Sequence, residues 1–174
     1  MSEKSDYPMA LTPPAAAVIP VDTAMISAAK KASRESPRKR VILPLHKQGA
    51  ASLQRMLNAI QPGSYIRPHR HAEDRAESIM VISGSILYLT FTEEGNVDEV
   101  FTLTVGSGRI GIDIEGGVWH SFMVLEPDTV LFEVKPGPYN TQTDKEFAPW
   151  APAEHSEDAA TYLDQLLQYE TTSR

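Results

Sequence analysis

The feature that most constrains the fold is a long series of short segments with period-two alternation, which extends from Val41 to Lys135. These segments are rich in Val, Ile, Phe, Tyr and Thr, and Gly, Pro and Asn separate them. Many short strands at near-regular spacing are typical of an antiparallel sandwich or barrel, whereas a parallel sheet would need helices between its strands. The sequence therefore predicts an all-β domain.

The expected strands follow from the turn residues that interrupt this pattern. Glu93–Asn96 has the composition of a hairpin turn, Gly84 that of a tight turn or bulge, and Gly106–Gly108 that of a third reversal. Strands are expected near residues 41–45, 53–61, 64–68, 77–83, 85–92, 97–104, 109–114, 119–125 and 129–135.

A helix is expected on each side of the strands. Asp22 can cap a helix that runs to about Arg34, and a second helix with one apolar face is expected after Ser156. Four prolines among small residues precede the first helix and favour a flexible arm. The predicted organisation is a flexible N-terminal arm over residues 1–21, a domain with its N-terminal helix over 22–154, and a C-terminal helix over 155–174.

The charge of the chain argues against a nucleic-acid partner. The chain has 174 residues, the length of one ordinary domain, and its net charge is −7, whereas phosphate-backbone binding needs a dominant basic surface. One basic cluster lacks interleaved aromatic residues and is interpreted as a solvated helix face. Its members are Lys30, Lys31, Arg34, Arg38, Lys39 and Arg40.

The expected location of the protein depends on whether the sequence contains a membrane-spanning segment or a secretory signal. No segment is long and apolar enough to span a bilayer, and the N-terminal residues lack the pattern of a secretory signal. We therefore expect no membrane association and a cytoplasmic location.

The absence of cysteine limits the chemistry that this chain can perform. The sequence has no cysteine and five histidines. This composition excludes disulfides, thiolate zinc sites, iron–sulfur clusters and a cysteine nucleophile. A metal ion would have to be held by imidazole nitrogens and oxygen atoms.

Three of the histidines have the spacing of metal ligands. His69 and His71 are two residues apart, so on an extended strand their imidazoles leave the same face. His120 follows a glycine-rich turn and lies in an apolar segment, where an imidazole without a partner would be costly. His46 and His155 are interpreted as ordinary structural residues.

A carboxylate is expected to complete this site. Glu77 shares the parity of Ile79 and Val81, so it should point inward, and a buried carboxylate needs a partner. Glu73 and Asp74 remain alternatives for this role. Three neutral imidazoles and one carboxylate suit a divalent ion of zinc, iron, manganese or nickel, with positions left open for water or a ligand.

These residues also resemble the two sequence motifs of the cupins. Residues 63–84 fit the first motif, G(X)5HXH(X)nE(X)6G, with n equal to five rather than the usual three or four. Gly117 and His120 fit the core of the second motif, PXG(X)2H, although Glu115 occupies its proline position and Val124 its usual asparagine position.

The chain resembles one subgroup of the cupins more closely. Residues 58–65, 68–71, 132–139 and 144–152 look like the corresponding parts of the WbuC-type cupin fold metalloproteins, and the resemblance covers about Arg38 to Glu154. Ala76 departs from the subgroup, in which an aromatic residue is expected before the glutamate.

The resemblance implies a fold, a ligand set and a biological setting. The implied fold is a double-stranded β-helix, the cupin or jelly-roll barrel, with a metal ion in its mouth held by His69, His71, Glu77 and His120. The implied setting is the synthesis of O-antigen or another bacterial surface polysaccharide. Many cupins dimerise through an N-terminal arm, so a homodimer is expected. The resemblance does not supply a reaction.

Four further side chains are candidates for catalysis. If residues 64–68 form a strand, Tyr65 and Arg67 share the face of His69, and Arg67 can pair with a carboxylate or phosphate on a ligand. Glu133 and Lys135 share one face of the last strand. They form either a salt bridge at the rim or a proton-transfer pair, and parity does not choose between rim and interior.

Three functions are consistent with these residues. The first is a metal-dependent protein that binds or modifies a sugar or sugar nucleotide, with isomerase or epimerase chemistry if it is an enzyme. The second is an iron-dependent dioxygenase of small molecules. The third is a non-catalytic module that binds a small ligand through its metal.

Overall fold

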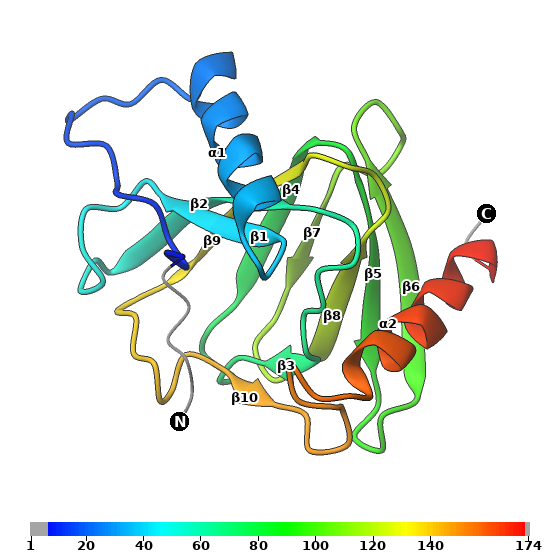
Figure 1. Cartoon of the computed structure of the whole chain (residues 1–174). Helices are drawn as coiled ribbons and strands as arrows, with labels where there is room; N and C mark the ends of the chain where they lie inside the picture. Colours follow the sequence, from blue (N-terminus) through cyan, green and yellow to red (C-terminus); the bar gives the residue numbers. More distant parts are fainter. Residues whose placement is uncertain (1–6, 173–174) are drawn as a thin grey trace.

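Two five-stranded antiparallel sheets face each other across the core of the computed structural model, which describes residues 7–172 (Figure 1). Residues 1–6 of the predicted arm and residues 173–174 of the predicted C-terminal helix lie outside this range. The first sheet contains, in spatial order, β1 (Arg40–Pro44), β2 (Leu53–Ile60), β9 (Thr129–Pro136), β4 (Glu77–Ser83) and β7 (Gly111–Ile114). The second contains β10 (Glu146–Phe147), β3 (His69–Arg70), β8 (Trp119–Val124), β5 (Ser85–Phe91) and β6 (Val97–Thr104).

The order of the strands defines a jelly roll. From β2 to β9 the chain passes repeatedly between the two sheets, so that the first sheet holds the order β2-β9-β4-β7 and the second the order β3-β8-β5-β6. Two facing four-stranded sheets with this exchange form the double-stranded β-helix. The predicted fold class is therefore confirmed, and most of the strands begin and end within two residues of their expected limits.

The helices cover the outer faces of the two sheets. The helix α1 (Thr23–Glu35) packs on the first sheet through a cluster that includes Ala29, Leu57 and Val130. As predicted, Asp22 caps it, because its side chain accepts a hydrogen bond from the backbone nitrogen of Met25. No helix in the described part of the chain has the length and hydropathy needed to span a bilayer.

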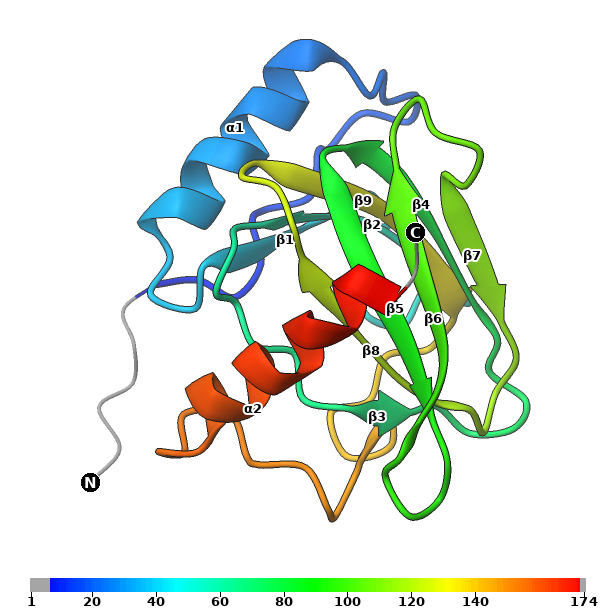
Figure 2. The ribbon, with the colours of Figure 1, turned by 90° about the vertical axis from the view of Figure 1, so that its right-hand side faces the viewer.

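The helix α2 (Ala159–Leu167) and the following 3-10 helix η1 (Gln168–Thr172) lie across the second sheet (Figure 2). Leu163 and Leu166 of α2 pack in one cluster with Leu87 of β5 and Met123 of β8. The strands β5 and β8 are consequently buried on both faces. Full burial of each large apolar side chain stabilises the fold by about 1.5–3 kcal/mol.

The expected strand over residues 64–68 does not form, and only His69–Arg70 pair as β3. Other groups bind the backbone carbonyl oxygens of this segment. Arg40 donates to the oxygen of Tyr65, Ser121 to that of Ile66, and the backbone nitrogen of Ala148 to that of Pro68. These contacts take the place of a strand ladder, so the parity assumed for Tyr65 and Arg67 does not apply.

Part of the predicted arm lies along the edge of the first sheet. Ala10 forms a parallel bridge with Ile42, and the backbone nitrogen of Leu11 donates to the oxygen of Ile42 at 2.7 Å. This contact covers the edge of β1, which would otherwise present unpaired backbone groups. The domain boundaries given above stay a prediction.

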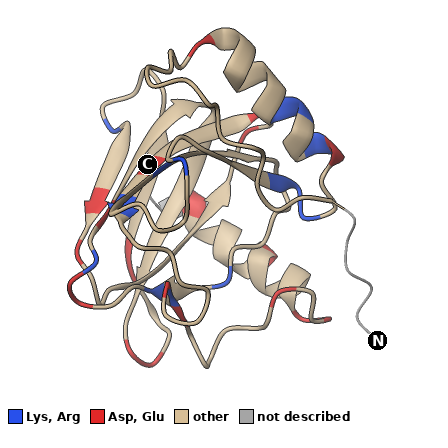
Figure 3. Cartoon of the chain, turned by 90° about the vertical axis from the view of Figure 1, so that its left-hand side faces the viewer, with Lys and Arg blue, Asp and Glu red and all other residues tan. Residues whose placement is uncertain are grey.

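The basic cluster lies on α1 and at the start of β1, where Lys and Arg are drawn in blue in Figure 3. Several of its members bind carboxylates of the same chain. Arg34 pairs with Asp128, and both Arg38 and Arg40 pair with Glu154 at 2.8 Å. Several of its charges therefore join α1 and β1 to distant segments of the barrel.

Candidate metal centre

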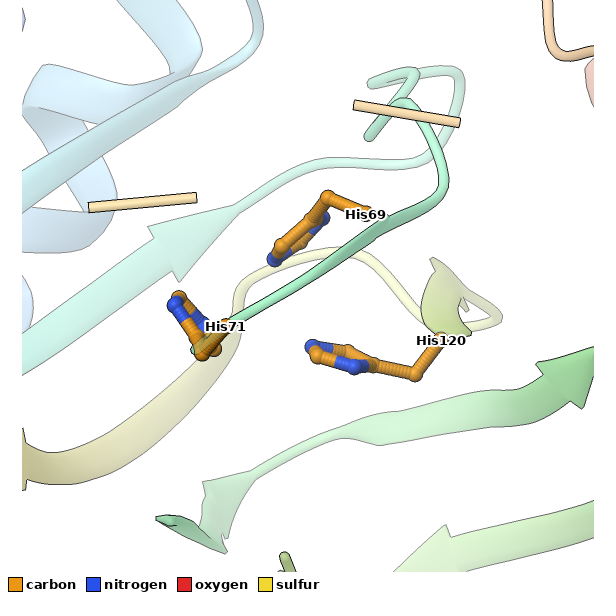
Figure 4. A group of neighbouring side chains, drawn as sticks. All are labelled: His69, His71 and His120. Atoms are coloured by element: carbon orange, nitrogen blue, oxygen red, sulfur yellow. The ribbon is translucent and has the colours of Figure 1, made fainter. Parts of the chain in front are cut away.

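Three buried histidines point toward one another (Figure 4). His69 in β3 lies directly opposite His120 in β8, and His71 follows β3 by one residue. One ring nitrogen from each of the three lies within 4.8 Å of the others. The three histidines that the sequence analysis assigned to one site therefore lie together in the structure.

A close turn sets the position of His71 relative to His120. The backbone nitrogen of Gly117 donates to the oxygen of His71 at 2.9 Å. A Cβ atom on Gly116 would lie 2.1 Å from the backbone oxygen of Ala72, so only glycine fits there. The glycine pair holds the turn before β8 against the segment that follows β3.

The hydrogen bonds of the three imidazoles select one tautomer. Nδ1 of His69 contacts the backbone oxygen of Arg67 at 3.0 Å, and Nδ1 of His120 contacts that of Val118 at 2.8 Å. Nδ1 of His71 contacts the backbone oxygen of Asp144 at 2.5 Å. A carbonyl oxygen only accepts, so each Nδ1 carries the proton and each Nε2 presents its lone pair, as in histidines that bind metals.

The unpaired ring nitrogens fit a metal ion. The Nε2 atoms of His71 and His120 are buried and have no hydrogen-bond partner in the described part of the chain. Leaving buried polar atoms unpaired costs free energy, and coordination would remove that cost. Burial and then the charge of Lys145 hold the pKa of His69 well below its usual value, which keeps this imidazole neutral.

Glu77 reaches the same place from the first sheet. Its Oε1 atom lies 3.6 Å from Nε2 of His71, and its Oε2 atom lies 3.5 Å from Nε2 of His120. Two ligands of one ion lie about 3.0–3.4 Å apart when each is about 2.1 Å from the metal. Glu73 and Asp74, the alternatives, are exposed, so Glu77 is the carboxylate that the fold brings to the histidines.

Glu133 and Lys135 lie inside the barrel rather than at its rim, and both are 8% exposed. Nζ of Lys135 is 3.6 Å from Oε1 of Glu133, while Asn58 donates to the other oxygen of Glu133. Burial and then the charge of Glu77 raise the pKa of Glu133 to about 8, against the opposing effect of Lys135. This pair can hold a proton within the interior.

Tyr65 and Arg67 do not join the cluster. The Tyr65 hydroxyl donates to the backbone oxygen of Pro152 at 2.9 Å, and its ring meets Tyr162 edge-on. Arg67 donates to the backbone oxygen of Ala148 at 2.7 Å. Both side chains hold the C-terminal segment against the barrel.

Sequence reasoning missed Asp144 and Tyr88. Asp144 binds His71 through its backbone oxygen and Lys135 through its carboxylate at 3.0 Å. The Tyr88 ring stacks on that of His120 at 5.9 Å, and its buried hydroxyl has no hydrogen-bond partner among residues 7–172. The inward parity of Tyr88 with Ile86 was a usable signal, but its nearness to His120 depends on the register between β5 and β8.

A pocket of about 650 Å³ opens beside His71. A volume of this size suits a small molecule. The lining is mostly polar and charged, and it comprises Arg70, His71, Ala72, Glu73, Glu93, Gly117, Gln142, Thr143, Lys145 and Glu146.

Sequence comparisons match only part of the chain. A family model described as a domain of unknown function (DUF6016) matches residues 21–103, which include His69, His71 and Glu77 but not His120. No curated protein matches the chain in sequence.

Solved structures of several proteins are similar to this chain. KdgF from Halomonas sp. is 18% identical, with a TM-score of 0.44 over 59% of this chain and 80% of its own. A variant of oxalate decarboxylase from Bacillus subtilis is 15% identical, with a TM-score of 0.49 over 78% of this chain and 33% of its own. The capsular polysaccharide assembling protein CapF from Staphylococcus aureus is 20% identical, with a TM-score of 0.47 over 62% of this chain and 31% of its own.

Proposed function

We propose that His69, His71, His120 and Glu77 hold one divalent metal ion, and that the adjoining pocket binds a small molecule beside that ion. The observation that carries this proposal is the set of three Nδ1 contacts to backbone oxygens, which leaves every Nε2 free to coordinate. In His71 and His120 the second ring nitrogen is buried without a hydrogen-bond partner in the described part of the chain. A purely structural histidine would gain nothing from this arrangement, whereas a metal ligand requires a free nitrogen.

The donor set narrows the metal to a class. Nitrogen and carboxylate ligands suit divalent zinc, iron, manganese or nickel, and four protein ligands leave positions for others in an octahedral ion. When bound, such an ion supplies Lewis-acid chemistry to a carbonyl or hydroxyl oxygen of the ligand.

The interior side chains offer proton transfer near the ligand. Glu133 lies between Asn58 and Lys135, and burial raises the pKa of its carboxyl. A buried carboxyl of this kind can take up or release a proton. If the protein is an enzyme, we propose that Glu133 holds the proton and that Lys135 orients it. Isomerase or epimerase chemistry is the reaction class that such a pair serves.

A sugar or sugar nucleotide from bacterial surface polysaccharide synthesis is the proposed ligand. The support is the resemblance of residues 58–65 and 132–139 to WbuC-type cupins, together with a polar pocket wall that suits a hydroxylated molecule. Dimerisation through the N-terminal arm is a separate proposal, which gel filtration tests.

The metal site is tested by measuring bound metal in protein purified without a histidine tag. We expect an equimolar amount of metal in the wild type and in His155→Ala, whose side chain is 73% exposed. We expect metal to be lost from His69→Ala and from His120→Ala. Unchanged metal content in both of these variants would contradict the site.

The identity of the metal then separates the functions. Iron together with ligand-dependent oxygen uptake would indicate a dioxygenase. Zinc that binds a ligand without turnover would indicate a binding module.

A further inference from the structure

We propose that the ligand carries an anionic oxygen group, a carboxylate or a phosphate, and that the ammonium group of Lys145 binds this group in the pocket. The inference rests on the proposed function, because it places the anion beside the proposed metal ligands. It names the chemical class of the ligand, which the histidines alone do not.

Lys145 lies at the pocket wall, and its ammonium group forms no ion pair with a described residue. Its ammonium group lies 6.0 Å from the ring centre of Phe147, but it has no hydrogen bond or ion pair with any of residues 7–172. Burial and then the charge of Lys135 lower the pKa of Lys145, so its charged form is disfavoured where it stands. An anion beside it would relieve this cost.

The other cations near the pocket already have partners. Arg70 pairs with Glu93 at 3.0 Å and with Glu146 at 2.8 Å. These two pairs also occupy two of the acidic side chains in the lining, and the third, Glu73, is exposed. Lys145 is thus the positive charge in the lining that stays available to a ligand.

The charge balance behind the pocket favours the same conclusion. The carboxyl groups around the histidines are those of Glu77, Glu133 and Asp144, so they supply at most three negative charges against three cationic side chains. The cations are Arg75, Lys135 and Lys145. A divalent ion would add two positive charges that no carboxylate balances, and a partly buried excess of charge attracts an anion.

The segment that carries Lys145 also carries neutral hydrogen-bond donors. Gln142 and Thr143 line the pocket with it. The buried carboxylate of Asp144 anchors this segment through Lys135, so Lys145 is held at the wall. The ammonium group of a lysine acts as a point charge and can donate hydrogen bonds to either a carboxylate or a phosphate.

Calorimetric titration with three sugars that differ only at carbon 6 tests the inference. The protein is loaded with Zn²⁺, its metal content is measured, and glucose, glucuronate and glucose 6-phosphate are titrated into it. We expect one or both of the acids to bind at least about tenfold more tightly than glucose, because a charge-assisted contact discriminates by about this factor. The acid that binds identifies the anionic group.

Variants of Lys145 show whether this residue is responsible. We expect Lys145→Met and Lys145→Gln to retain their metal and to bind the acid about tenfold more weakly. Lys31→Met on the exposed face of α1 is the matched control and should bind it as the wild type does. Thermal melting of each variant reports whether it is folded.

The outcomes distinguish the inference from the proposed function. A wild type that holds no metal overturns the proposed function and the inference with it. A metal-loaded wild type that binds glucose as tightly as the acids, or binds none of the three sugars, overturns the inference alone. Equal acid binding by folded Lys145 variants and wild type also overturns it.

Discussion

The backbone oxygen of Asp144 accepts a hydrogen bond of 2.5 Å from Nδ1 of His71. The same residue binds Lys135 with its carboxylate, so one buried aspartate connects the pocket segment, the last long strand and a proposed metal ligand. The orientation of His71 thereby depends on where the segment around Asp144 lies. Hydrogen bonds of this kind fix the direction of a ligating imidazole and tune its affinity.

Asp144→Asn should weaken metal binding. The variant keeps the backbone oxygen but loses the charge that attracts Lys135 and Arg75, so the segment that orients His71 is held less firmly. We expect Zn²⁺ affinity, measured by competition with a chelator, to fall by about tenfold. The exposed Asp98→Asn is the control, and equal affinities in the two variants would show that Asp144 does not position the site.

Gly116→Ala should disturb the site through the backbone. The new Cβ would meet the oxygen of Ala72 at 2.1 Å, so the turn must move away from the segment that carries His71. We expect the free energy of unfolding to fall by about 1–3 kcal/mol, with a loss of metal affinity.

The matched control for this change is Gly108→Ala, where a Cβ would have open space around it. Chemical denaturation should show little change there. If Gly116→Ala were as stable as Gly108→Ala, the close contact at Ala72 would not constrain the fold.

Several parts of the fold and site could be predicted because they depend on local pattern. Alternation and turn residues located the long strands, and the two-residue spacing of His69 and His71 placed both on one side of the chain. The parity of Glu77 with Ile79 correctly indicated an inward carboxylate.

The remaining parts depend on contacts between distant segments. An extended strand would place Tyr65 near His69, but groups from three other segments bind the carbonyl oxygens of Tyr65, Ile66 and Pro68. Asp144 and Lys145 follow an irregular loop, whose path no periodicity encodes.

The ion pairs of Glu154 should make stability depend on pH. Burial acts to raise the pKa of Glu154, but the hydrogen bond from Arg38 and the charge of Arg40 outweigh it, and the pKa lies below its usual value. A carboxyl with a lowered folded pKa stabilises the fold above its unfolded pKa, about 4.3, and this contribution disappears as the pH falls through the folded pKa.

Glu154→Gln measures this contribution. The difference in free energy of unfolding between wild type and variant should be largest at pH 7, on the order of 1 kcal/mol, and should shrink in acid below about pH 4. Urea denaturation at several pH values provides the measurement. A difference that stays constant down to pH 2 would contradict the role of the Glu154 charge.

Removing either of two tyrosine hydroxyls inside the protein should change the free energy of unfolding differently. The Tyr65 hydroxyl donates to the backbone oxygen of Pro152, so Tyr65→Phe should lower the free energy of unfolding by about 0.5–1.5 kcal/mol. The Tyr88 hydroxyl is buried without a partner in the described part of the chain, so Tyr88→Phe in metal-free protein should leave stability unchanged or raise it.

The same pair of variants tests whether Tyr88 faces the ligand. Its ring stacks on His120 with an interplanar angle of 8°, so a ligand at the proposed metal can offer the hydroxyl its missing partner. Tyr88→Phe should then retain its metal but bind more weakly the sugar acid that the wild type binds. Tyr65→Phe should bind the same sugar acid as tightly as the wild type does. A destabilised Tyr88→Phe would mean that the hydroxyl already has a partner within the folded protein, and unchanged ligand affinity would remove Tyr88 from the binding site.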